Sequence, residues 1–240
     1  MTPPRTAPLG DAQVRRIGYG AMQLAGPGVF GPPRDRDAAL TVLRRAVELG
    51  VDHIDTSQYY GPDVVNDLIR EALHPYPDGL RLVTKVGARR DARGGWLPAG
   101  RPEELRTGVE DNLRSLAVER LHAVNLRLMP RHGGDDGGDA DAGVPIAEQV
   151  GALAELRAEG KLLHIGISNV SRAQVEEALA SAGLACVQNA YSVLDRSSQD
   201  VVDLCAAHGM AFVAFFPLGS AFTGGPATLA ADPAVARVAA

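Results

Sequence analysis

The chain has 240 residues, of which 45% are hydrophobic and 22% are charged, and its formal net charge is −5 at pH 7. This acidic balance gives no electrostatic attraction to nucleic acid or to an anionic membrane, so we expect neither as a partner. No apolar run is long enough for a transmembrane helix and the N-terminus lacks the apolar stretch of a signal peptide, which predicts a cytoplasmic protein.

Short apolar runs alternate with segments of helical spacing along most of the chain. The runs that we expect to form strands lie at residues 16–24, 53–56, 80–86, 123–128, 164–168, 185–190 and 211–218. The segments that we expect to form helices lie at residues 37–49, 64–73, 102–116, 146–159, 171–182 and 198–207. Residues 220–231 are expected to be a loop, with a last helix beginning near Asp232.

Helix starts and buried helix faces can also be predicted. Asp37, Ser171 and Ser198 stand where a capping residue is expected. Apolar spacing predicts core-facing stripes on the first and third helices, made of Val42, Ala46, Leu49, Leu105, Val109, Leu113 and Leu116.

Apolar strands that alternate with helices predict a parallel sheet covered by helices. Seven such strands, in a chain close to the roughly 250 residues of a typical example, favour an α/β TIM barrel over a doubly wound sheet. The glycine fingerprint of a dinucleotide-binding fold is also missing, because Gly18 and Gly20 are followed by Gln23 instead of a third glycine. We expect residues 1–240 to form one barrel domain.

The strand count falls one short of an eight-stranded barrel, because the seventh expected strand ends near Leu218. We therefore expect the chain to be truncated before the eighth strand, which would leave two unpaired sheet edges. A neighbouring copy that closes the gap is the alternative, and it predicts self-association through the open edge.

Metal binding is not expected from the sequence. Cys186 and Cys205 both lie in apolar segments, which predicts two buried free thiols in a reducing compartment. The acidic, glycine-rich residues 131–143 resemble a calcium loop, but the twelfth position from Asp135 is Ile146, where that motif needs glutamate. We expect a solvated surface loop there.

Three side chains at the ends of two neighbouring strands predict acid–base chemistry: Asp55, Tyr60 and Lys85. A free tyrosine has a pKa of about 10, which a nearby ammonium lowers and which makes the phenol a better acid. A carboxylate beside the lysine keeps that lysine charged and in place. Such a site can protonate a carbonyl oxygen while hydride reaches the carbon. The alternative is a buried ion pair beside a packed tyrosine.

Several motifs in order resemble the aldo-keto reductase family. They are IGYGAM at 17–22, DTSQYYG at 55–61, VTKVG at 83–87, GKLLHIGISN at 160–169, VQNAY at 187–191 and FFPLG at 215–219. The segments DTSQYYGP at 55–62, TKVGARR at 84–90 and VNLR at 124–127 look closest to the bacterial pyridoxal reductase branch.

The resemblance implies a TIM barrel that reduces a small aldehyde or ketone with NADPH, with pyridoxal as one candidate substrate. Tyr60 would be the proton donor, Lys85 would tune its pKa and Asp55 would pair with Lys85. The resemblance also implies a cofactor site made of Gly20, Met22, Asp55, Ser168, Asn169, Gln188, Phe215, Pro217, Leu218 and Gly219. Within it, Ser168, Asn169 and Gln188 would bind the carboxamide and Phe215 would stack on the nicotinamide.

The fourth expected strand departs from the family pattern, because it lacks the histidine that most members carry near its end. Arg127 stands at that position and would donate hydrogen bonds to a developing alkoxide, or bind an anionic group of the substrate. The alternative is an arginine paired with an acid inside the barrel.

The family's clamp for the 2′-phosphate of NADPH follows the eighth strand, and none of it is in these residues. Coenzyme preference is therefore open. Two other functional interpretations also stay open at this point: a catalytically silent nucleotide-binding or regulatory barrel, and a non-functional fragment.

Overall fold

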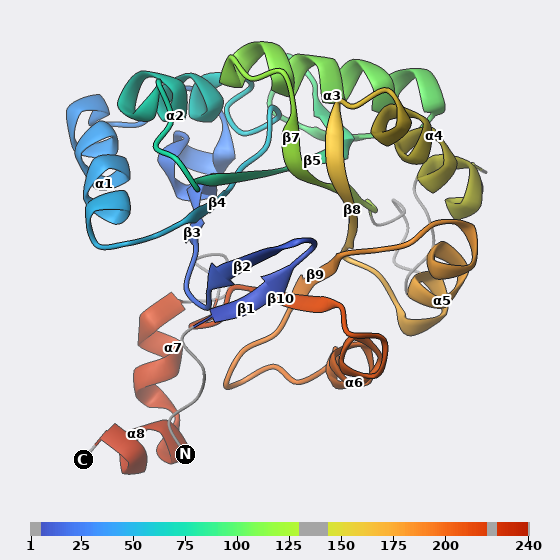
Figure 1. The fold of residues 1–240 in the computed structure, drawn as a ribbon. Coiled ribbons are helices and arrows are strands. Elements are labelled where there is room, and N and C mark those ends of the chain that lie inside the picture. Colours follow the sequence, from blue (N-terminus) through green and yellow to red (C-terminus); the bar gives the residue numbers. More distant parts are fainter. Residues whose placement is uncertain (1–5, 130–143, 220–224, 240) are drawn as a thin grey trace.

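The computed structural model describes residues 6–129, 144–219 and 225–239. Seven parallel strands form a nearly closed barrel with helices on its outside, as Figure 1 shows. From one edge to the other the strands are β10 (Ala211–Phe215), β9 (Cys186–Ala190), β8 (Leu162–Ser168), β7 (Leu121–Arg127), β5 (Arg81–Arg90), β4 (His53–Asp55) and β3 (Tyr19–Gly20). The predicted α/β TIM-barrel architecture is confirmed.

All six predicted helices are present, with ends that differ by at most a few residues from the prediction. They are α1 (Arg36–Glu48), α2 (Val64–Leu73), α3 (Pro102–Leu116), α4 (Ile146–Ala158), α5 (Arg172–Ser181) and α6 (Gln199–His208). Helix α8 (Pro233–Ala239) begins where expected, but part of the predicted loop before it is helix α7 (Gly225–Ala231). The sequence of α7 explains the error, because Pro226 is tolerated in a first turn and an alanine- and leucine-rich stretch follows.

The first predicted strand, at residues 16–24, is mostly wrong. Only Tyr19–Gly20 pair with β4, and the chain then enters the short 3-10 helices η1 (Ala21–Leu24) and η2 (Pro27–Val29). The apolar Ile17 that suggested a buried strand is 78% exposed. Glycines on both sides of Tyr19 weaken strand formation here.

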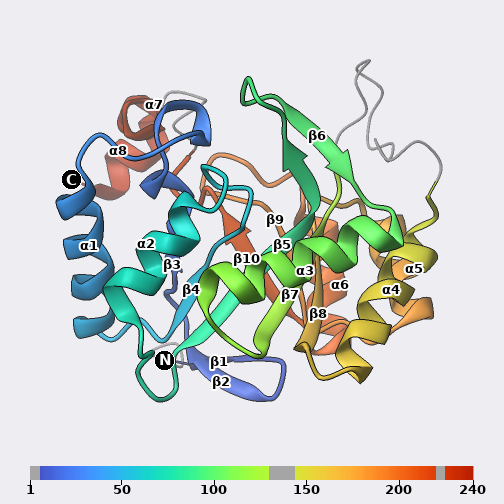
Figure 2. The ribbon, with the colours of Figure 1, turned by 90° about the horizontal axis from the view of Figure 1, so that it is seen from above.

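Two antiparallel hairpins were not predicted, and Figure 2 shows them at opposite ends of the barrel. The first joins β1 (Thr6–Leu9) to β2 (Ala12–Arg15) through a two-residue Gly-Asp turn in which Gly10 has φ +64°. Such a dipeptide between two short runs is a hairpin signal. The second forms because β5 continues to Arg90 and pairs with β6 (Trp96–Ala99).

The predicted buried face of α1 is wrong and that of α3 is right. Val42 and Leu49 are 44% and 64% exposed, whereas Ala39, Leu40 and Leu43 of the neighbouring stripe are buried. Both stripes of α1 have helical spacing, so only the packing of the helix on the barrel decides between them. In α3, by contrast, the expected residues Leu105, Val109 and Leu116 are fully buried, and Leu113 packs against them.

The predicted helix caps are also only partly right. Asp35 caps α1 in place of Asp37 and accepts a hydrogen bond from the Ala38 amide at 2.9 Å. Ser171 caps α5 as predicted, in a reciprocal pair with Gln174. Ser198 stands at the start of α6, but its hydroxyl does not cap the helix and accepts from Asn189 instead.

The thiols of Cys186 and Cys205 are buried and free, as predicted. The described helices include none that is long and apolar enough to cross a membrane. The stretch at 131–143, predicted above to be a surface loop, lies outside the described residues. Strands β3 and β10 are the two edges of the sheet within the described chain, and self-association through them stays a prediction.

Candidate active site

The expected catalytic side chains meet at the carboxyl ends of the barrel strands. Asp55 is the last residue of β4, Lys85 lies near the end of the part of β5 that pairs with its barrel neighbours, and Arg127 ends β7. Parallel strands of a barrel deliver their carboxyl ends to one face, which is where TIM-barrel active sites are built. Short apolar strands followed by polar residues therefore explain why this site forms here.

A buried ion pair forms the centre of the site. The Nζ atom of Lys85 lies 2.5 Å from Oδ2 of Asp55 and 3.1 Å from the Thr56 carbonyl oxygen. The other carboxylate oxygen of Asp55 accepts from Nε2 of Gln188 at 3.0 Å. Only 6% of the Lys85 side chain is exposed, so its charge is compensated within the site instead of by water.

Tyr60 lies against this ion pair. Its ring is buried, the Lys85 ammonium stands 5.1 Å from the ring centroid, and the Tyr59 ring meets it edge-on at 5.4 Å. Burial raises the pKa of Tyr60 well above its ordinary value, the Asp55 carboxylate raises it further, and Arg127 lowers it.

This direction differs from the expectation that Lys85 lowers the pKa of Tyr60. The ammonium of Lys85 is neutralised by Asp55 at contact distance, so its field at the phenol is weak. Burial of the ring is the larger effect, and Arg127 is the cation that opposes it.

Arg127 bridges two residues of the expected cofactor site. Its Nη1 atom donates to the Ser168 hydroxyl at 3.2 Å, and its guanidinium stands 5.1 Å from the centroid of the Phe215 ring. Within the described parts of the chain no carboxylate lies within 4.0 Å of it, so the alternative of an arginine paired with an acid finds no partner there. Its charge is therefore not neutralised by any carboxylate among the described residues.

Gln188 has one polar atom that finds no partner among the described residues. Its Nε2 atom is held by Asp55, but its Oε1 atom is buried and has no hydrogen bond among the described residues. Ser168 is the register partner of Gln188 on the next strand and is also fully buried. Asn169 follows with a left-handed φ of +61° and donates from Nδ2 to the Leu128 carbonyl oxygen at 2.9 Å.

The remaining residues of the expected cofactor site are Gly20, Met22, Pro217, Leu218 and Gly219. Gly20 pairs in register with Asp55, and a Cβ atom built on it would meet nothing within 4 Å. Met22 lies on η1 and packs against the main core. After β10, Pro217 and Leu218 are exposed and Gly219 has φ +83°. No described contact joins these three to the catalytic side chains.

A buried polar network behind Lys85 was not predicted. Asn112 of α3 accepts from Thr84 at 2.5 Å and from Asn66 at 3.0 Å, and Asn66 accepts from Thr56 at 2.8 Å. Asn112 also donates to the Lys85 carbonyl oxygen at 3.4 Å. These bonds fix the backbone on both sides of the ion pair. Polar residues on otherwise apolar helix faces, such as Asn66 and Asn112, were the signal in the sequence.

The model of the "Aldo/keto reductase family" matches residues 16–234 of this chain. The chain belongs to the aldo/keto reductase family. It is 53% identical over 214 residues to pyridoxine 4-dehydrogenase of Escherichia coli (strain K12), an alignment that covers 89% of this chain and 73% of that protein.

Solved structures of this family have a similar fold. An aldo-keto reductase from Bacillus halodurans, in its holo form, has a TM-score of 0.73 and 27% identity, and the match covers 88% of this chain and 65% of that chain. An aldo-keto reductase from Klebsiella pneumoniae in complex with NADPH has a TM-score of 0.70 over 89% of this chain and 68% of that chain. At 23% identity the latter similarity shows the shared fold alone.

Proposed function

We propose that this chain is an NADPH-dependent oxidoreductase that reduces a small aldehyde or ketone to the alcohol, with Tyr60 as the proton donor. The observation that carries the proposal is the buried Lys85–Asp55 pair, bonded to Gln188 and lying against the Tyr60 ring at the carboxyl ends of the strands. Family membership supports the same reaction class.

In this proposal, Tyr60 donates the proton to the carbonyl oxygen. Its raised pKa keeps the phenol protonated near neutral pH, which is the form that an acid catalyst needs. In the reduction the phenol O–H bond breaks and the proton goes to the carbonyl oxygen, leaving a phenolate that regains a proton from water. Arg127 stabilises that developing negative charge. Lys85 neutralises the Asp55 carboxylate, which would otherwise oppose it.

The cofactor face consists of residues from β8, β9 and β10. When bound, NADPH supplies the hydride that reaches the carbonyl carbon. The unpaired Oε1 of Gln188 is a buried acceptor that suits the amide N–H groups of a carboxamide, and Ser168 and Asn169 stand beside it. Phe215 would stack on the nicotinamide ring, while Gly20, Met22 and residues 217–219 would line the rest of the path.

Pyridoxal is the substrate that we propose to test first. The 53% identity to Escherichia coli pyridoxine 4-dehydrogenase supports it. An aromatic wall also lies beside the catalytic tyrosine, because Tyr59 meets Trp96 edge-on at 5.5 Å and Arg90 stacks over Trp96 at 3.9 Å. Such a wall suits a planar aromatic aldehyde, and Arg127 would bind its phenolate or another anionic group.

The test is to incubate the chain with NADPH and a panel of aldehydes that includes pyridoxal, following both nicotinamide absorbance and the alcohol product. Saturable turnover of pyridoxal supports the full proposal, and turnover of other aldehydes alone supports the reaction but not the substrate. NADPH binding without any alcohol would contradict the proposal and favour a catalytically silent nucleotide-binding barrel.

A further inference from the structure

A second cluster of ionisable side chains lies at the opposite end of the barrel. Asp11 is in the turn of the β1–β2 hairpin, His122 is near the start of β7, and His164 is in the first half of β8. One ligand-type atom from each of the three lies within 4.8 Å of the other two. The reaction proposed above uses none of them.

Asp11 and His164 bring a carboxylate oxygen and an imidazole nitrogen into contact. Nε2 of His164 lies 2.6 Å from Oδ1 of Asp11, and the Asp11 amide N–H also points at this nitrogen from 3.2 Å. Without a metal ion, a proton on Nε2 of His164 satisfies the carboxylate oxygen, since even a neutral imidazole N–H donates to a carboxylate. A metal ion that replaces this proton would meet one lone pair from each of the two groups.

His122 adds a third candidate ligand. Its ring centroid lies 5.0 Å from that of His164, and the residue is 6% exposed. Its Nε2 atom is 3.0 Å from the Leu9 carbonyl oxygen, which can only accept, so Nε2 carries the proton and Nδ1 keeps its lone pair. A carbonyl partner fixes the tautomer of metal-bound imidazoles in the same way.

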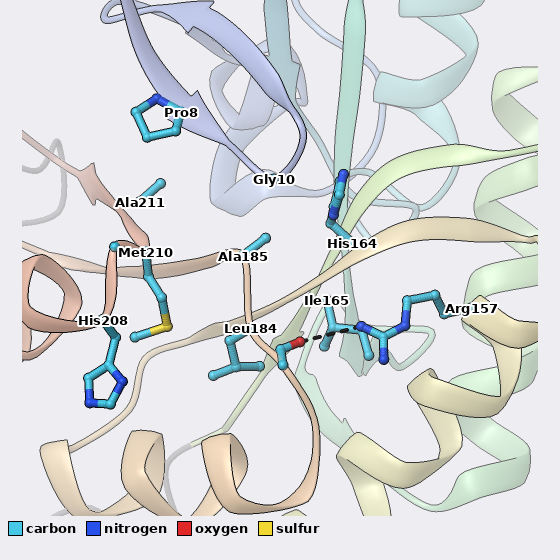
Figure 3. A pocket seen from close by; sticks show the side chains of 12 residues that line it. Pro8, Gly10, Arg157, His164, Ile165, Leu184, Ala185, His208, Met210 and Ala211 are labelled. Carbon is cyan, nitrogen blue, oxygen red and sulfur yellow. Dashed lines mark hydrogen bonds between the residues drawn. The ribbon is translucent and has the colours of Figure 1, made fainter.

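His164 of this cluster lines a pocket of about 250 Å³ between the hairpin and the amino ends of β8 to β10. Figure 3 shows the His164 ring on the pocket wall, pointing toward the hairpin turn at Gly10. The turn approaches so closely that a Cβ on Gly10 would lie 2.3 Å from the His164 ring. Because the Asp11 side chain is 70% exposed, an ion can reach the cluster from solvent.

We propose that Asp11, His122 and His164 bind one divalent transition-metal ion of the Zn²⁺ class, with water in the remaining position. Two imidazoles and one carboxylate suit Zn²⁺ and its neighbours better than Ca²⁺ or Mg²⁺, which prefer oxygen ligands. Metal–ligand bonds of about 2.0–2.2 Å would require the three side chains to adjust, with the Asp11 and His164 atoms moving apart from their present 2.6 Å. The ion would tie the hairpin turn to β7 and β8 and so fasten the amino end of the barrel.

The test is a titration of the chelator-treated chain with Co²⁺, followed by visible absorption and by calorimetry. We expect one equivalent to bind with the absorption bands of a site containing imidazole ligands. Asp11→Asn and His164→Gln should each weaken binding at least tenfold. The matched control is His208→Gln, which changes an exposed histidine on the same pocket but outside the cluster and should bind Co²⁺ like the unchanged chain.

Two results would overturn the proposal. If no saturable binding occurs, the contact between Asp11 and His164 is an ordinary ion pair. If all variants bind alike, the ion is held elsewhere. Asp11→Asn is the decisive variant because the residue is exposed in a turn, so its removal leaves the folded core intact; circular dichroism of each variant checks this.

Discussion

The two ends of the barrel carry their charges in different ways. At the carboxyl ends of the strands, Lys85 is buried, bonded to Asp55, and supported from behind by the Asn66–Asn112 network. At the amino ends, Asp11 and His164 meet near the surface, with a single hairpin turn holding the carboxylate. A site with buried, compensated charge is suited to chemistry, whereas a half-exposed cluster on a turn is suited to binding an ion.

The largest effect is expected from Lys85→Met, which breaks the buried ion pair. Loss of the ammonium leaves the Asp55 carboxylate beside Tyr60 without its partner, so kcat should fall about 10³-fold and unfolding should become easier by on the order of 3 kcal/mol. Steady-state reduction of pyridoxal and urea unfolding measure the two effects. Near-normal turnover would show that Lys85 has only a structural role.

Next in size is Arg127→Gln, which removes the cation next to Ser168 and Phe215. Loss of a donor to a developing alkoxide typically costs about 10²-fold in kcat. We expect that loss with little change in stability, because Arg127 has no ion pair among the described residues. A change in KM for pyridoxal alone would instead assign Arg127 to substrate binding.

Asn112→Ala tests the support behind the site. It leaves Thr84 and Asn66 without their shared acceptor, and should lower the free energy of unfolding by about 1–3 kcal/mol. Turnover at a temperature where the variant is folded should fall only severalfold, since Lys85 keeps its bonds to Asp55 and Thr56. A loss as large as that of Lys85→Met would mean that the network positions the lysine directly.

The smallest effect concerns pH at the amino end of the barrel. Burial lowers the pKa of His122, so the unfolded chain binds a proton on this residue that the folded chain does not. Stability from this group is therefore present above about pH 6.5 and is lost as the pH falls below it. The drop in unfolding free energy between pH 7 and pH 5 should be shallower in His122→Gln, measured in urea without metal; an equal drop in both proteins would refute the assignment.

The clustering of the carboxyl-end side chains could be predicted because they lie in apolar barrel strands or in the segments that follow them. Asp55, Lys85 and Gln188 could be assigned to the site from the expected barrel alone, without knowledge of contacts between distant parts of the chain. The pKa of Tyr60 could not be predicted in the same way, because its direction depends on how deeply the ring is buried and on how closely Asp55 neutralises Lys85.

The amino-end cluster and the α1 face were missed for a different reason. Asp11 and His164 are 153 positions apart and no motif relates them, so only the folded hairpin brings them together. On α1, two apolar stripes fit the same helical spacing, and packing of the helix on the barrel buries the stripe that contains Leu43. Local sequence patterns thus predicted the side chains that the barrel strands position. They failed for side chains whose neighbours depend on how a hairpin or a helix packs against the barrel.

The most direct test of the proposed reaction compares Tyr60→Phe with the unchanged chain in two measurements, NADPH binding and pyridoxal turnover. Tyr76→Phe is the matched control, because it removes another tyrosine hydroxyl, a partly buried one that donates to the Leu116 carbonyl oxygen away from the catalytic residues. We predict unchanged NADPH affinity in both variants, with turnover lost by about 10²–10⁴-fold only in Tyr60→Phe. Turnover that survives in Tyr60→Phe would contradict the role of Tyr60 as proton donor.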